Sequence, residues 1–170
     1  MTGHPGAAEV RIRELGPGRF EVLDAVLAGL SPASRYHRFH SPVPRLTPQV
    51  RQALAAVDGH DHVAVAAFTD AGRPIGLARL IAVQDGPSEL AVEVVDEWQR
   101  QGVGALLVRA VAELGRAAGH QRVVADVLAE NVAAQVLFLL LFPWASAVGD
   151  GPELRFTADL APGDHLLWAA

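Results

Sequence analysis

Apolar and polar residues follow one another along the chain in patterns that predict short strands and amphipathic helices. Alternation with a period of two favours a strand, and recurrence with a period near 3.6 favours a helix. Strands are expected at residues 9–13, 62–69, 75–83, 89–95, 122–128, 143–148 and 153–160. Helices are expected at residues 18–30, 47–58, 103–118 and 131–141. This order predicts an α+β domain in which a mixed sheet carries helices on both faces.

Residues 31–48 interrupt these patterns with four prolines and three serines. Clusters of these residue types are typical of loops, so we expect a loop with at most one helical turn. At the end of this stretch, Thr47 and Pro48 are typical of an N-cap and a first helical position. No internal repeat or domain break is visible, so we predict one domain over residues 1–170, of which residues 1–8 are flexible.

The composition limits the kinds of partner and site that the chain can have. With 170 residues, 51% hydrophobic and 19% charged, the chain can bury the core of a single domain. Its net charge of −5 gives no general attraction to nucleic acid. The longest apolar run, residues 136–148, is shorter than the about 20 residues that a bilayer requires, and no signal peptide precedes it. We therefore expect a cytoplasmic protein without nucleic-acid or membrane partners.

The chain has no cysteine, which excludes disulfides, a thiolate nucleophile and zinc sites with cysteine ligands. His60 and His62 could point to one face of a strand and bind a metal together. No third ligand accompanies them in the sequence. We therefore expect no metal site.

Two glycines stand between the strand expected at residues 89–95 and the helix expected at residues 103–118. The first N–H groups of a helix lack intrahelical partners and carry a partial positive charge. Gly102 and Gly104 let a phosphate approach this backbone without meeting a Cβ atom, and Arg100 adds a full positive charge. The stretch therefore predicts a site for a phosphorylated ligand.

Two common nucleotide-binding fingerprints do not fit this stretch. A dinucleotide fingerprint requires a third glycine where the chain has Leu107. A P-loop requires a lysine, and all 14 basic residues of the chain are arginines. Both classes of nucleotide-binding module are therefore disfavoured.

The sequence Gln-Arg-Gln-Gly-Val-Gly at residues 99–104 resembles the acetyl-CoA loop, Gln-x-x-Gly-x-Gly, of the Gcn5-related N-acetyltransferase (GNAT) family. The Asn-x-x-Ala-x-x-Leu pattern at residues 131–137 and the order of elements also match that family. Residues 31–48 resemble the acceptor-side segment of a bacterial subgroup that includes the Pat-type protein lysine acetyltransferases. The resemblance implies the GNAT fold, with a mixed, mostly antiparallel sheet of about six or seven strands and a splayed strand pair at the acetyl-CoA site.

The resemblance also implies which residues bind the cosubstrate, acetyl-CoA, with no metal involved. The end of the strand before the loop would pair with the pantetheine arm, and backbone N–H groups of the loop would hold the pyrophosphate. Asn131 would contact the pantetheine arm or orient the thioester, or it would only cap the following helix. The implied acetyl-CoA contacts are Val94, Val95, Asp96, Gln99, Arg100, Gln101, Gly102, Val103, Gly104, Ala105 and Asn131.

The reaction implied by the resemblance is direct attack of a neutral primary amine on the acetyl thioester. A lysine-like amine has a pKa of about 10.4 and is mostly protonated at neutral pH, so the site requires a base. Glu89 is the candidate base, because it lies ten residues before Gln99, where the Pat-type subgroup carries its catalytic glutamate. Glu93 is the second candidate, since a strand places it on the same face as Glu89. Each carboxylate would raise the pKa of the other.

Two departures from the family pattern concern the general acid and the acceptor pocket. Many members carry a tyrosine seven residues after the capping asparagine, where this chain has Phe138, which has no proton to donate. The Gly-Phe pair that usually follows the helix is also missing, and the chain must turn at Pro143 instead. Tyr36 and His37, in the acceptor-side segment, are the expected substrate-binding residues.

The leading hypothesis is an acetyl-CoA-dependent N-acetyltransferase that acts on a primary amine, with a protein lysine favoured as the acceptor. The alternatives are an enzyme for a small amine and a non-catalytic acyl-CoA-binding sensor or scaffold, which Phe138 keeps open. Dimers are common in the family, which makes a homodimer a candidate state. Because the chain has no lysine, any acetyl-lysine formed in a reaction must belong to the acceptor.

Overall fold

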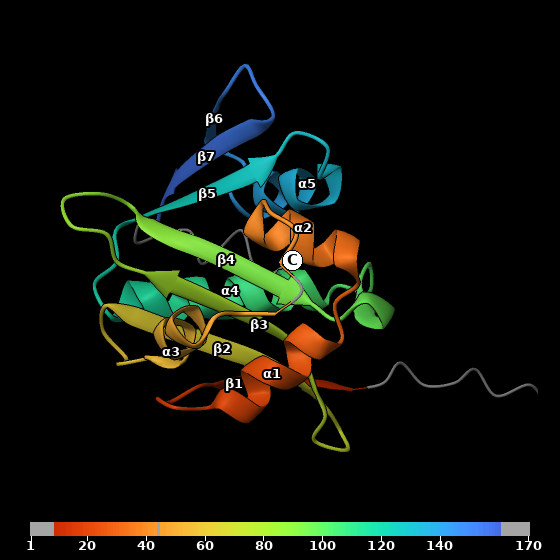
Figure 1. Cartoon of the computed structure of the whole chain (residues 1–170). Coiled ribbons are helices and arrows are strands. Elements are labelled where there is room, and N and C mark those ends of the chain that lie inside the picture. The colour runs from red at the N-terminus through yellow and green to blue at the C-terminus, as the bar shows by residue number, and fades with distance from the viewer. Residues whose placement is uncertain (1–8, 44, 161–170) are drawn as a thin grey trace, which may run out of the picture.

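An open sheet of seven strands forms the centre of the described residues, which are 9–43 and 45–160 of the computed structural model (Figure 1). Along the order β1-β2-β3-β4-β5-β7-β6, every neighbouring pair is antiparallel except the parallel pair β4–β5. The strands are β1 (Val10–Glu14), β2 (His62–Thr69), β3 (Pro74–Ile81), β4 (Ser88–Val94), β5 (Arg122–Leu128), β6 (Ser146–Val148) and β7 (Glu153–Asp159). The mixed, mostly antiparallel sheet expected from the sequence is confirmed. The flexibility expected for residues 1–8 lies outside the described residues.

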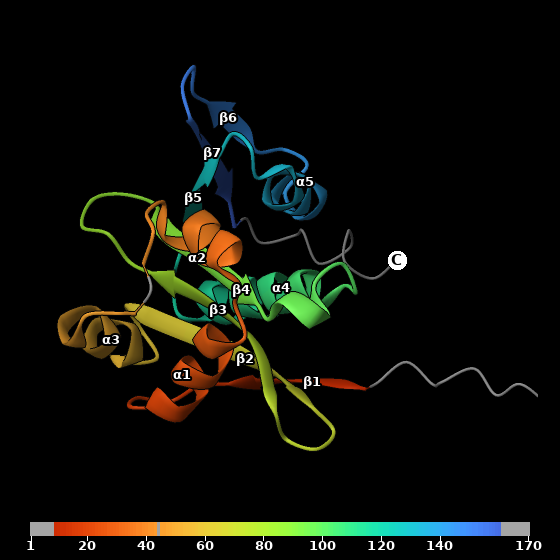
Figure 2. The same cartoon turned by 45° about the vertical axis from the view of Figure 1, so that its right-hand side comes forward.

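Helices cover both faces of this sheet, as expected (Figure 2). Within the described residues they are α1 (Phe20–Ala28), α2 (Pro32–Phe39), α3 (Pro48–Ala55), α4 (Val103–Ala117) and α5 (Val132–Leu141). The first three lie on one face, and α4 and α5 lie on the other (Figures 1 and 2). The sheet is therefore the middle layer between two helical layers.

The side chains of β2 show how the sheet serves two cores at once. Val63 and Val65 belong to the core that includes α4 and α5, whereas Ala64 and Ala66 belong to the core that includes α1. Successive side chains of a strand point to opposite faces, so a strand covered on both faces has to be apolar throughout. This explains the nearly uninterrupted apolar sequence of β2.

Helix α2 corrects the loop that was expected at residues 31–48. Ser31 caps this helix, because its Oγ accepts a hydrogen bond from the backbone N–H of Ser34 at 3.2 Å. Pro32 stands at the first helical position, where its missing N–H would have no helical partner in any case. The helix ends at Phe39, and its C-cap, His40, has a left-handed φ of 55°. Proline disrupts a helix only from within, so the proline count of this segment does not exclude a helix.

Strands β4 and β5 pair only where both begin. Ser88 lies opposite Val123, and Glu89 lies opposite Val124. Beyond these positions the two strands diverge (Figure 1). On its other edge, β5 is paired along its whole length with β7. The splayed strand pair expected from the sequence is therefore confirmed, and it leaves a gap in the sheet between β4 and β5.

His62, at the start of β2, is buried in a way that affects the pH dependence of stability. Its Nδ1 contacts the carbonyl oxygen of Ala56 at 3.1 Å, and its buried Nε2 has no hydrogen-bond partner among the described residues. Burial and the nearby charge of Arg79 lower the pKa of His62 below its ordinary value of 6.5. His62 therefore binds a proton less readily in the folded protein than in the unfolded chain.

We expect the melting temperature to fall as the pH decreases from about 7 to about 5, because His62 binds a proton more readily in the unfolded chain than in the folded protein. His62→Gln should flatten this part of the profile in thermal melts recorded across that pH range. His60→Gln is the matched control, since the His60 side chain is 79% exposed, and it should keep the wild-type slope. A wild-type slope in the His62 variant would contradict the linkage.

Candidate active site

The edge of β4 that faces the gap presents backbone groups to a ligand. The N–H of Val95, just after β4, donates to the carbonyl of Ile75 in β3 at 2.9 Å. Successive backbone groups of a strand point to opposite sides. The backbone N–H and carbonyl groups of Val92 and Val94 therefore point away from β3 and toward the gap. An extended ligand that carries amide groups can pair with such an edge as another strand would.

Two of the three strand residues expected to contact pantetheine use their N–H groups elsewhere. Val95 donates to Ile75, and Asp96 donates to the carbonyl of Gly29 at 3.1 Å. Asp96 also lies outside β4, at the start of a short 3₁₀ turn (Asp96–Trp98). Val94 is therefore the member of this group whose N–H points to the gap, and its contact with pantetheine stays a prediction.

The N-terminus of α4 lies beside the end of β4, since a Cβ atom added to Gly104 would lie 3.9 Å from the Val94 side chain. Gly102 is the N-cap, with a left-handed φ of 83°, and no side chain caps the helix. A Cβ atom on Gly102 would meet nothing within 4 Å, so the backbone here is open. The first N–H groups of the helix, at residues 103–105, have no intrahelical partner and lie at this open end. The geometry fits the phosphate site expected from the sequence.

The two glutamines of the loop hold its backbone. The Nε2 of Gln99 donates to the carbonyl of Val94 at 3.0 Å and to the Oγ of Ser34 in α2 at 3.1 Å. The Nε2 of Gln101 donates to the carbonyl of Glu97 at 2.8 Å. Both side chains thus fix the path from β4 to α4, and their direct contact with acetyl-CoA stays a prediction.

Asn131 follows β5 and precedes α5. Its Oδ1 accepts a hydrogen bond from the backbone N–H of Ala134 at 3.2 Å. The capping role considered for this residue is therefore confirmed. Its contact with the pantetheine arm stays a prediction.

Glu93 is buried between two arginines from different elements. Its Oε1 accepts a hydrogen bond from Arg79 Nη2 at 3.0 Å, and its Oε2 accepts one from Arg38 Nε at 2.9 Å. Burial alone would raise the pKa of this carboxyl, but the charges of Arg79 and Arg38 outweigh burial and lower its pKa. The raised pKa expected for this residue is therefore wrong, because its neighbours are cations. A carboxylate whose pKa is lowered in this way binds an abstracted proton weakly, and it is therefore a poor general base.

Removing either cation would leave the Glu93 charge buried with less compensation. Breaking a buried ion pair in this way typically costs about 3–5 kcal/mol. Burial also lowers the pKa of the Arg79 guanidinium, while the charge of Glu93 raises it. The three side chains therefore act as one unit.

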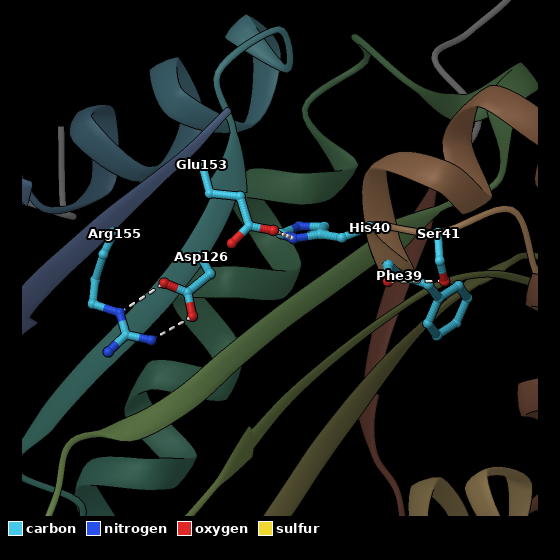
Figure 3. Close-up of polar contacts among 6 residues, drawn as sticks. All are labelled: Phe39, His40, Ser41, Asp126, Glu153 and Arg155. Atoms are coloured by element: carbon cyan, nitrogen blue, oxygen red, sulfur yellow. Dashed lines mark hydrogen bonds and ion pairs between the residues drawn. The ribbon is translucent and has the colours of Figure 1, made fainter. Parts of the chain in front are cut away.

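Glu89 lies at the exposed start of β4, on the same face as Glu93, because the register between β3 and β4 is continuous. It lies near Arg155 of β7, which binds Asp126 through two hydrogen bonds of 2.7 Å (Figure 3). Asp126 is the main cause of the raised pKa of Arg155, and Glu89 adds to it. Of the two candidate bases, Glu89 is therefore the exposed one and Glu93 the buried one.

Helix α2 reaches across the gap through two histidines. The Nε2 of His37 lies 3.3 Å from Glu130, which follows β5. The Nδ1 of His40 lies 2.5 Å from Glu153 at the start of β7 (Figure 3). Tyr36, on the same helix, is 39% exposed. The structure thus places Tyr36 and His37 on one element that spans the two diverging halves of the sheet.

Phe138 occupies the position where many family members carry tyrosine. It is buried, with its ring centroid 4.9 Å from that of Phe142 and 5.4 Å from that of Phe156. The ring belongs to the core beneath α5. It therefore supplies packing and no proton.

The part of the chain that the structure describes holds no group of three or more histidine, aspartate or glutamate side chains suited to a metal ion. Within residues 9–43 and 45–160, no helix combines the length and apolar character needed to cross a bilayer. The ring of His62 is engaged with the Ala56 carbonyl at the start of β2.

Three residues of the site were not predicted from the sequence. The gap-facing backbone of Val92 follows from strand periodicity once the register is known. Arg79 stands within an apolar strand, and a buried arginine implies a buried partner. Arg38 gave no such signal, because 55 residues separate it from Glu93.

Comparison with known proteins agrees with this geometry. A curated acetyltransferase from Pseudomonas aeruginosa is 29% identical over 112 residues, which cover 64% of this chain and 60% of that protein. The chain therefore spans less than two thirds of that relative's length.

Solved structures show the same arrangement of elements. The GNAT domain of PAT from S. lividans is 25% identical, with a TM-score of 0.78 over 88% of this chain and 90% of that domain. A cAMP-binding acyltransferase from Mycobacterium smegmatis is 26% identical, with a TM-score of 0.62 over 91% of this chain and 44% of that protein. The profile of the acetyltransferase (GNAT) family matches residues 25–140, and the chain belongs to this family.

Proposed function

We propose that the chain transfers an acetyl group from acetyl-CoA to a primary amine. The observation that carries the proposal is the gap between β4 and β5, with the N-terminus of α4 uncapped by any side chain at its end. Members of the family use acetyl-CoA or another acyl-CoA as cosubstrate. One junction supplies a strand edge for the pantetheine arm and a positive helix end for the pyrophosphate.

Glu89 is the proposed general base. It accepts a proton from the acceptor ammonium, directly or through a water molecule, and leaves a neutral amine. The nitrogen attacks the thioester carbon, and the carbonyl electrons move onto oxygen. We propose that a backbone N–H group on the gap-facing edge of β4, that of Val92, stabilises this oxyanion. When the oxyanion collapses, the C–S bond breaks, the nitrogen gives up its second proton to water, and the CoA thiolate leaves.

No side chain of the described residues stands out as the acid for the thiolate. Phe138 is in the core, and Tyr36 lies on α2, on the acceptor side. A CoA thiolate is a stable leaving group compared with an alkoxide, because thiols have a pKa of about 8.5. We propose that solvent protonates it.

We propose a protein lysine as the acceptor. Support comes from the resemblance of residues 31–48 and Glu89 to the Pat-type enzymes, and from the match to the GNAT domain of S. lividans PAT. Tyr36 and His37 would line the approach of the lysine. A small amine is the alternative acceptor, and a homodimer stays a prediction.

Acetyl-CoA is expected to raise the melting temperature of the chain. A ligand that binds the folded state at about 100 times its Kd adds about 2.7 kcal/mol, which corresponds to about 5–10 °C for a chain of this size. Thermal melts with and without acetyl-CoA measure this shift. The absence of a shift at saturating acetyl-CoA would contradict both the enzyme and the acyl-CoA sensor.

Turnover separates those two functions. Release of CoA thiol is measured with lysine peptides and with small amines, and mass spectrometry locates the acetyl group. Any acetyl-lysine belongs to the acceptor, because the chain has no lysine. Binding without turnover on any of these amines would favour the sensor or scaffold and contradict the enzyme.

A further inference from the structure

Helix α2 is held in place by polar contacts. None of its eight residues is buried, whereas α1 buries Val22, Leu23 and Val26. An element with few buried apolar contacts has low local stability of its own. The position of α2 therefore depends on its hydrogen bonds and ion pairs.

The first of these contacts joins α2 to the loop before α4. The backbone N–H of Ser31 donates to Asp96 Oδ1 at 3.0 Å, and Gln99 Nε2 donates to Ser34 Oγ at 3.1 Å. Burial alone would raise the pKa of Asp96, but hydrogen bonds from Ser31 and Ser34 outweigh it and lower that pKa. The N-terminal end of α2 is thus fixed beside the proposed phosphate site.

The second contact is the ion pair between Arg38 and Glu93. The Glu93 side chain is 1% exposed and the Arg38 side chain is 19% exposed, so water screens this pair little. The contacts at the far end of α2, His37–Glu130 and His40–Glu153, involve carboxylates that are half exposed or more. Exposed pairs of that kind contribute little to holding an element in place. Of these three ion pairs, the one made by Arg38 is therefore expected to contribute most to holding α2 on the sheet.

Attaching a helix through a buried ion pair costs desolvation free energy. The Nε and Nη1 atoms of Arg79 are buried without a hydrogen-bond partner among the described residues. Replacing buried ion pairs with apolar residues is often neutral or stabilising, so stability alone does not account for the three charges. What the ion pair provides is a single position of α2 relative to β4, the strand that would carry the thioester.

We propose that Arg38 is a positioning residue for the acceptor amine. Through Glu93 it holds α2 across the gap between β4 and β5, and so it sets the approach of the amine to the thioester. The inference rests on the proposed function. Arg38 itself touches neither the amine nor acetyl-CoA in this role.

The test compares Arg38→Gln and Arg38→Lys with the wild type in the full chain. Arg51→Gln is the matched control, because Arg51 also binds a carboxylate, that of Asp24 at 2.8 and 2.6 Å, but joins α3 to α1. Hydrogen exchange is followed at the amides of α2 and α1. In Arg38→Gln we expect exchange in α2 to be faster by about tenfold or more, with α1 unchanged. Arg51→Gln should leave α2 as in the wild type.

The kinetic probe is a capped Gly-Lys-Gly peptide with acetyl-CoA. In Arg38→Gln we expect the KM for the peptide to rise by about fivefold or more, while the KM for acetyl-CoA stays unchanged. Arg38→Lys should recover much of the peptide KM, since a lysine can still pair with Glu93. A merely structural loss would raise the KM for both substrates alike.

Wild-type exchange in α2 together with a wild-type peptide KM in Arg38→Gln would overturn the inference. An equal rise in the KM for both substrates would also overturn it. If the wild-type chain acetylates neither the peptide nor small amines, the proposed function fails and the acceptor role of Arg38 fails with it. Hydrogen exchange would then still decide whether Arg38 holds α2 to β4.

Discussion

Replacing Glu89 with glutamine is expected to lower the turnover number at neutral pH by at least about tenfold, because a general base typically contributes about 10²–10⁴ to the rate. Glutamine has the size of glutamate but accepts no proton. Acetyl-CoA binding should be unchanged, since Glu89 lies at the start of β4 and the proposed phosphate site lies beyond its end. Initial rates and the acetyl-CoA Kd measure the two effects separately.

Glu113→Gln is the matched control for this substitution. Glu113 is exposed on α4, which packs against the face of the sheet opposite to the one that carries Glu89 and Glu93, so its loss should leave turnover unchanged. Without a base, the rate of the Glu89 variant should increase with pH as the acceptor amine loses its own proton near a pKa of about 10.4. Unchanged turnover of the Glu89 variant between about pH 6 and pH 9 would remove Glu89 as the base.

Replacing Gly102 with alanine is expected to weaken acetyl-CoA binding by about tenfold or more, which corresponds to about 1.4 kcal/mol. The φ of Gly102 is 83°, a conformation that an alanine adopts only with strain. Its Cβ would also project into the open space where we place the pyrophosphate. Isothermal titration with acetyl-CoA measures the loss of affinity, and thermal melts measure the loss of stability.

Gly59→Ala is the control that separates strain from ligand contact. Gly59 has a φ of 78°, and a Cβ there would also meet nothing within 4 Å. It precedes β2, at the end of the sheet where β4 begins, away from the loop before α4. Both variants should lose similar stability, and only the Gly102 variant should lose affinity. Equal affinity in both variants would show that the pyrophosphate binds elsewhere.

Much of the fold could be predicted because its signals are local. The strands at residues 62–69 and 122–128 were predicted with the bounds that the structure shows. The glycines at the start of α4 and the capping Asn131 were predicted from neighbouring residues alone. Caps, glycines with positive φ and apolar periodicity all act within a few residues, so a sequence displays them directly.

Helix α2 was not predicted, because the local signals in its sequence favour two different structures. Pro32 and Ser31 are typical of a helix start, but the prolines that follow, such as Pro42, are typical of a loop. The composition of the whole segment favoured a loop over residues 31–48. The helix is held by contacts with Asp96, Gln99 and Glu93, which lie far away in the sequence.

The sequence by itself indicated the family, the order of the elements apart from α2, and the glycine turn before α4, because each follows from short-range pattern. Only the tertiary structure decided the state of the two glutamates. Glu89 and Glu93 lie four residues apart on one strand, yet one is exposed and the other is buried between Arg38 and Arg79. A pKa depends on burial and on charges within a few ångströms, whatever their separation along the chain. Those distances exist only once α2 and β3 have packed against β4.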